Sequence, residues 1–224
     1  MRTGAVWFWI GLFGLGAYHG VNPGMGWLFA VALALQEKRR CAIYRALPPI
    51  ALGHALGVAV IIVPLALLQT IAPPWPLRTM AAVALVGFGG YRLLRFRHPR
   101  WVGMRVGPRD LTLWSFLMAS AHGAGLMLVP FVLGWSSAAQ APHAQHTEAV
   151  RQLLVPELAA SVSAPVLGGL AIGVHTVGHL LVLTLVALVV YEKLGLALLR
   201  RAWFNLDLLW AAALIAAGVL TQIL

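Results

Sequence analysis

Histidines inside apolar sequence are the residues of this chain with the most capacity for chemistry. Five of the eight histidines lie within long apolar stretches: His19, His54, His122, His175 and His179. An ionisable side chain inside a bilayer costs a few kcal/mol unless it faces water or a partner. Neutral imidazole binds zinc, copper, nickel, cobalt and ferrous iron, and the i, i+4 spacing of His175 and His179 presents two imidazoles to one ion. The five histidines therefore predict a metal site within the membrane.

Four further residues are candidate accessory ligands: Asn22, Met25, Met118 and Asp207. The two thioethers would favour a softer ion such as Cu(I), although methionine in apolar helices more often serves packing. Asn22 and the carbonyls freed by Pro23 would complete a coordination shell, or the same residues form a hinge or a simple proline kink. Asp207 either caps a helix or guards an inner gate. The remaining Asp and Glu residues sit at the ends of apolar runs or in loops, so the site suits a borderline metal.

Composition places the chain in a bilayer. It is 61% hydrophobic and 10% charged, whereas soluble domains are nearer half apolar and a quarter charged. Long apolar runs without period-two alternation favour helices over a barrel. We expect an all-α integral membrane protein with six transmembrane helices, the first broken at Asn22-Pro23-Gly24. The six runs cover residues 5–36, 46–70, 79–94, 111–134, 164–191 and 204–223.

The basic residues predict the orientation. Most of the 16 Lys and Arg residues follow the first, third and fifth runs, and only Arg2, Arg78 and Arg151 fall on the other side. Cytoplasmic loops carry such an excess, so both termini are expected outside the cytoplasm of a bacterial-type inner membrane. The same placement explains the net charge of +10 by contact with lipid headgroups and argues against a nucleic-acid partner.

A polar stretch, 135–163, is then expected as a periplasmic loop. It contains His143, His146 and Glu148, and His-x-x-His beside a carboxylate is a candidate capture site for a metal ion. The alternative, which we favour, is a polar loop that happens to contain two histidines.

The two halves of the chain mirror each other around the histidines. His-Gly occurs at His19 and at His122, and each is followed in the next run by Gly-His, at His54 and His179. Residues 1–110 and 111–224 are therefore interpreted as two three-span repeats of a single membrane domain. An odd number of spans per repeat makes them inverted, the plan of many secondary transporters, whose sites lie at the repeat interface near the midplane.

Several segments resemble the lysine-exporter (LysE) translocator superfamily, which includes the nickel/cobalt-type (NicO) transporters. "NPGMGWLFAVALALQEKRR" is similar to the early Pro-Gly helix and its basic loop, and "LRTMAAVALVGFGGYRLLR" to the third span. "HGVNPGMGW" and "LGHALGV" resemble two segments of the nickel/cobalt branch, which matches His19, Asn22 and His54 to motif positions. The acidic residues and second histidine of that motif are missing, and the Pro-Gly-Pro of amino-acid exporters reads Pro-Gly-Met. The resemblance implies the fold more than the substrate.

These features predict a secondary transporter that moves nickel, cobalt, zinc or copper by alternating access, with export favoured. One alternative is an exporter of amino acids or other small organic solutes. Another is a membrane-embedded metal or haem protein, in which His122 would pair with His179. No nucleophile–base pair or phosphate loop stands out, so a transporter is favoured over an enzyme. The ion, the coupling and the oligomeric state, including a homo-oligomer, stay open.

Overall fold

The computed structural model describes residues 3–94, 106–140, 164–194 and 206–223. Within these residues every regular element is helical, as the all-α prediction requires. In chain order the elements are α1 (Thr3–Val21), the 3-10 turn η1 (Pro23–Met25), α2 (Trp27–Glu37), α3 (Cys41–Leu68), α4 (Pro74–Leu94), α5 (Pro108–Ala121), α6 (Ala124–Gln140), α8 (Ala164–Val189), the π-helical turn η3 (Val190–Leu194) and α10 (Leu206–Ile223).

Two helices are long and apolar enough to cross a membrane, Cys41–Leu68 and Pro165–Lys193. A third crossing is obtained if the pair Pro108–Ala121 and Ala124–Leu133, bent by 56°, counts as one span. These helices are compatible with a membrane protein. Helix α6 continues to Gln140 and so extends into the segment that is expected as an outer loop, 135–163. The rest of that loop lies outside the described residues.

The first apolar run breaks where the sequence predicts. The side-chain oxygen of Asn22 accepts a hydrogen bond from the Gly24 N–H at 2.9 Å and caps the 3-10 turn that Pro23 opens. Gly26, at φ 125°, then lets the chain enter α2, because only glycine adopts that conformation without strain. Proline, asparagine and glycine therefore convert one long run into two helices.

A second break interrupts the fourth run, and the sequence interpretation missed it. Helix α5 ends at Ala121, and Gly123 takes a left-handed φ of 70° before α6 begins at Ala124. Glycine just past a helix end is the usual C-terminal stop. The proline of this run, Pro130, lies inside α6 instead of at the break, which is why the signal differs from that of the first break.

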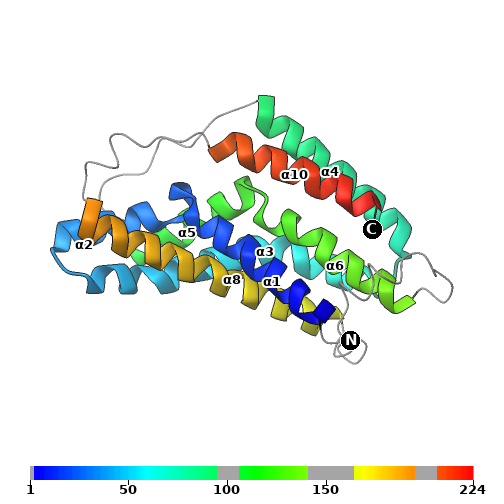
Figure 1. Ribbon diagram of the computed structural model, residues 1–224, viewed down its shortest axis with the longest axis horizontal. Coiled ribbons are helices and arrows are strands. Elements are labelled where there is room, and N and C mark those ends of the chain that lie inside the picture. The colour runs from blue at the N-terminus through cyan, green and yellow to red at the C-terminus, as the bar shows by residue number, and fades with distance from the viewer. Residues whose placement is uncertain (1–2, 95–105, 141–163, 195–205, 224) are drawn as a thin grey trace.

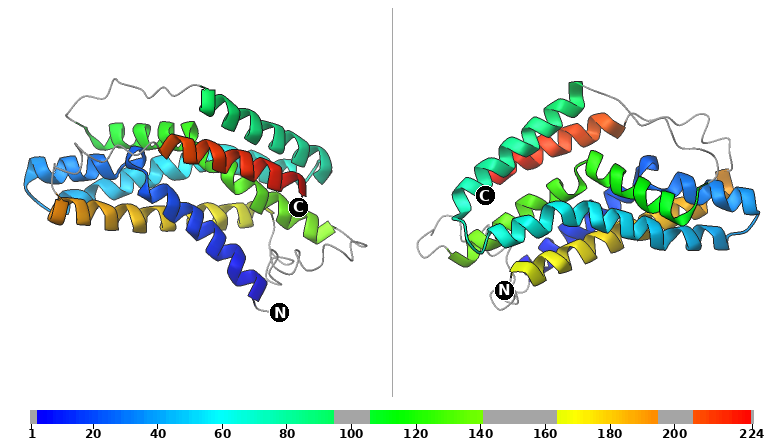
Figure 2. Two further views of the ribbon diagram at one scale, coloured as in Figure 1. Left: turned by 45° about the horizontal axis from the view of Figure 1, so that its top comes forward. Right: turned by 180° about the vertical axis from the view of Figure 1, so that it is seen from behind.

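Helices from the two halves of the chain pack against each other. Helix α1 packs on α8, α3 packs on α5, and α3 and α8 meet between them. Helices α4 and α10 lie side by side along one edge of the bundle in every view (Figures 1 and 2). Helix α1 begins and α10 ends at one end of the bundle, opposite the turn between α2 and α3 (Figure 1).

Glycines set the spacing of the central helices. A Cβ on Gly16 would collide with the carbonyl oxygen of His175, and one on Gly178 would collide with the carbonyl oxygen of Phe13. Both contacts join α1 to α8. With backbone against backbone, side chains on the neighbouring helix positions are brought close together at this crossing.

We expect Gly16→Ala to lower the free energy of unfolding by about 1–3 kcal/mol, because the added methyl meets backbone that is unable to rotate away. Gly14, on the same helix, has open space around the position of a Cβ. Gly14→Ala is the matched control and should raise stability by up to about 1 kcal/mol. Thermal unfolding of the detergent-solubilised protein measures both. Equal effects of the two substitutions would contradict a close α1–α8 contact.

Candidate functional site

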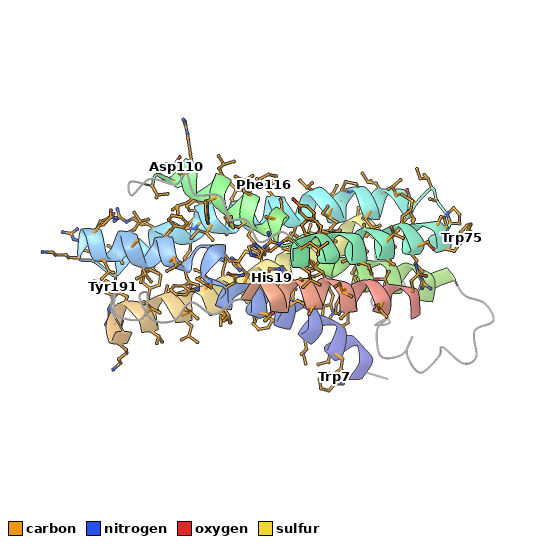
Figure 3. The ribbon with its side chains drawn as sticks, turned by 90° about the horizontal axis from the view of Figure 1, so that it is seen from above. Trp7, His19, Trp75, Asp110, Phe116 and Tyr191 are labelled. Atoms are coloured by element: carbon orange, nitrogen blue, oxygen red, sulfur yellow. The ribbon has the colours of Figure 1, made fainter. Side chains whose placement is uncertain are left out.

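The histidines of α3 and α8 lie between two apolar clusters of the bundle. On α3, Ile50 belongs to one buried cluster and Val58 to the other, and His54 is one helical turn from each. On α8 the order is Ala171, His175, His179 and Leu183, again with an apolar cluster on each side. Figure 3 shows His19 about midway between the ends of the bundle that Tyr191 and Trp75 mark.

Four imidazoles from three helices contact one another, and we call them the imidazole layer: His19 of α1, His54 of α3, and His175 and His179 of α8. All four are fully buried. The ring centres of His19 and His175 lie 4.9 Å apart, those of His54 and His175 5.3 Å, and those of His19 and His54 5.7 Å. Two imidazoles on one tetrahedral ion have ring centres about 5 Å apart, so these separations fall in the range that coordination needs.

His54 and His179 form the tightest pair. Their rings are stacked at 4.0 Å with 8° between the planes. Neither ring nitrogen of either residue has a hydrogen-bond partner in the described structure. Burying a polar group without a hydrogen bond costs about 1–3 kcal/mol. The pair therefore holds ligand-competent nitrogens that contribute nothing to the hydrogen bonding of the fold.

His19 and His122 are each oriented by a hydrogen bond to the backbone carbonyl four residues earlier in the chain. The Nδ1 of His19 lies 2.8 Å from the Leu15 carbonyl oxygen, and the Nδ1 of His122 lies 2.8 Å from the Met118 carbonyl oxygen. A carbonyl oxygen only accepts, so each Nδ1–H donates. In the neutral ring Nε2 then carries the lone pair, which is the form that binds a metal ion.

His122 follows the last residue of α5 and therefore lies on none of the three helices that carry the four rings. It is buried at the second helix break and interacts electrostatically with His19. Its Cε1 atom lies 3.9 Å, and the Met118 sulfur 3.8 Å, from the position that a Cβ would take on Gly24. The His122 ring and the thioether of Met118 therefore both face the first helix break.

The other candidate ligands lie in different parts of the chain. Asn22 uses its side-chain oxygen to cap η1, and Met25 is fully buried in that turn. Asp207 lies in the first turn of α10, a helix that packs on α4 and α6. The candidate capture residues, His143, His146 and Glu148, lie outside the described residues.

Two indoles that the sequence interpretation missed donate hydrogen bonds to backbone carbonyls at the first break. Trp27 donates its Nε1–H to the Val21 carbonyl at 3.0 Å, and Trp114 of α5 donates to the Gly24 carbonyl at 3.0 Å. Tryptophan near a proline break was a usable signal for Trp27. No local pattern points to Trp114, because its partner is 90 residues away. The Val21 and Gly24 carbonyls at this break therefore accept hydrogen bonds within the fold.

The described residues contain no group of three His, Cys, Asp or Glu side chains that already has the geometry of a metal site. Stacking explains this for His54 and His179, because a nitrogen lone pair lies in the plane of its ring and not on the face. Capture of an ion would therefore require at least one of the stacked rings to turn.

Comparison of the chain with family models, with curated proteins and with solved structures gave no match.

We expect His54→Leu to keep the free energy of unfolding unchanged or to raise it by up to about 2 kcal/mol, because it removes two buried nitrogens without partners. The comparison is Ser115→Ala, since Ser115 is equally buried but donates to the Ile50 carbonyl at 2.8 Å. That substitution should lower stability by about 1–3 kcal/mol. Chemical or thermal unfolding checks both. A large loss of stability in His54→Leu would show that the ring has a structural role.

Proposed function

We propose that this chain is a secondary transporter that moves a transition-metal cation across a membrane through the imidazole layer. The observation that carries the proposal is the His54–His179 pair, buried where helices from the two halves of the chain meet, with ring nitrogens that no described group satisfies. Histidines that only stabilise a fold are hydrogen-bonded when buried. Nitrogens kept without partners support a ligand-binding role.

The position of the layer supports transport more than fixed binding. Apolar clusters close the bundle on both sides of the rings. A site enclosed midway along the helices matches the occluded state of an alternating-access carrier, in which access opens to one side at a time. The two helix breaks, at Asn22–Gly26 and at His122–Gly123, lie next to ring-bearing segments, and we propose them as the hinges.

Reciprocal packing supports six spans in two inverted repeats, 1–110 and 111–224. The pairing of α1 with α8 has its counterpart in the pairing of α5 with α3, as expected if α1 corresponds to α5 and α3 to α8. Gly178, before His179, contacts the Phe13 carbonyl of α1, and Gly53, before His54, contacts the Thr112 carbonyl of α5. The resemblance to the LysE superfamily stays a prediction.

An exporter of small organic solutes is the main rival, in which the imidazoles would donate and accept hydrogen bonds. The haem alternative receives less support. Two axial histidines are separated by the plane of a macrocycle, whereas His179 stacks directly on His54.

We expect the purified full-length protein to bind at least one of zinc, nickel, cobalt or copper with micromolar affinity, and His179→Leu to weaken binding on the order of 100-fold. The double variant His143→Ala/His146→Ala should retain the affinity, because it changes only the predicted outer loop. Equilibrium dialysis in detergent measures the constants, and uptake of the bound ion into proteoliposomes tests transport. The proposal would be overturned if the protein bound none of the four metals, or if His179→Leu bound the metal with unchanged affinity.

The proposed orientation places the turn between α2 and α3 in the cytoplasm. Cys41, the single cysteine, is exposed at the start of α3. A membrane-impermeant maleimide should label it in inverted membrane vesicles and not in intact spheroplasts. In Cys41→Ser/Thr70→Cys, with a cysteine just beyond the other end of α3, the pattern should reverse. Labelling of both sites from one side would contradict a crossing by α3.

A further inference from the structure

We propose that the cargo is a soft monovalent cation of the Cu(I) type and that the thioether of Met118 is one of its ligands. This inference rests on the proposed function and names the substrate class of the same site. It follows from the charge of the layer, the position of one sulfur atom and the lack of a preformed set of ligands.

The charge of the layer favours a monovalent ion. Neutral imidazoles leave the full charge of a bound ion uncompensated. The cost of moving an ion out of water rises with the square of its charge, so it is about four times as large for a divalent ion as for a monovalent one. Three acidic side chains of the described structure are engaged elsewhere. Glu37 pairs with Arg45, Glu192 pairs with Arg40 at 2.8 Å, and Asp110 caps α5 through the Gly107 N–H.

The Met118 sulfur and the His122 ring approach the same point of the first helix break. Met118 is one helical turn before His122, and it accepts that ring's hydrogen bond on its own carbonyl oxygen. The sulfur and the His122 Cε1 both lie within 4 Å of the missing Cβ of Gly24, so glycine leaves the space between them open. Thioether and imidazole together are a ligand set that selects Cu(I) over hard divalent ions.

Met127 provides the contrast on the next helix. It is as deeply buried as Met118, yet it belongs to a cluster with Leu85 and Leu214, where its sulfur serves packing. Burial alone therefore does not distinguish the two methionines. The neighbouring imidazole does, which makes Met127 the matched control.

Coordination number points the same way. No three His, Cys, Asp or Glu side chains of the described residues are arranged around a common point. Zinc in proteins takes about four ligands, whereas Cu(I) is satisfied by about two or three. A pair such as Met118 and His122, joined by one ring turned out of the layer, would suffice for Cu(I) and leave a divalent ion under-coordinated.

The test uses full-length protein in detergent under anaerobic, reducing conditions. Competition with bicinchoninate measures Cu(I), Ag(I) serves as a redox-inert monovalent probe, and dialysis measures zinc and nickel. We expect one monovalent ion per chain, bound about 100-fold more tightly than zinc. Met118→Leu should weaken Cu(I) and Ag(I) binding about tenfold and leave zinc within about twofold. Met127→Leu should change none of these constants.

X-ray absorption at the copper edge should show a sulfur neighbour that Met118→Leu removes. If that variant does not fold, wild-type protein labelled with selenomethionine keeps the test decisive, because copper should then show a selenium neighbour. Zinc or nickel bound as tightly as Cu(I), and lost in His179→Leu, would overturn this inference while the proposed function stands. Absence of any metal binding would overturn both. A copper site without sulfur or selenium would also overturn the inference.

Discussion

The close crossing of α1, α3 and α8 is the constraint on which the rest of this structure depends. Gly16 and Gly178 bring the backbones of α1 and α8 into contact, and Gly53 does the same for α3 and α5. Because no side chains separate these backbones, the imidazole rings near the glycines are brought into a common layer. Larger residues at the glycines would separate the helices, and the four imidazoles would no longer meet.

The layer is an energetic liability that the flanking clusters offset. Side chains such as Leu12 and Ile62 on one side, and Ile43 and Leu183 on the other, are fully buried. Their packing stabilises the helices that carry His54 and His179, whose ring nitrogens have no hydrogen-bond partner in the described structure. Proteins retain such local conflicts chiefly at functional sites, where a more stable apolar residue would remove the activity. The arrangement is consistent with the binding role that we propose for the layer.

The two helix breaks achieve one result with different chemistry. The first uses an asparagine cap, a proline and two indole donors, whereas the second uses the left-handed conformation of Gly123. Both follow a histidine whose Nδ1 is held by the carbonyl four residues earlier. Each break thus ends a helix beside an imidazole of fixed orientation. In an inverted repeat the matching elements would move with respect to opposite sides of the membrane.

The sequence by itself determined the all-α class, the break at Asn22-Pro23-Gly24 and the shared face of His175 and His179, because each follows from residues within a few positions of one another. Span number, orientation and cargo are still predictions. Only the tertiary structure decided that His54 stacks on His179, that the His122 ring approaches Gly24 at the first break and that Trp114 closes this break from a distant helix. These contacts depend on how closely helices approach and on how each rotates about its axis. Periodicity gives the face of a helix, but the partner of that face is set by packing of the whole bundle.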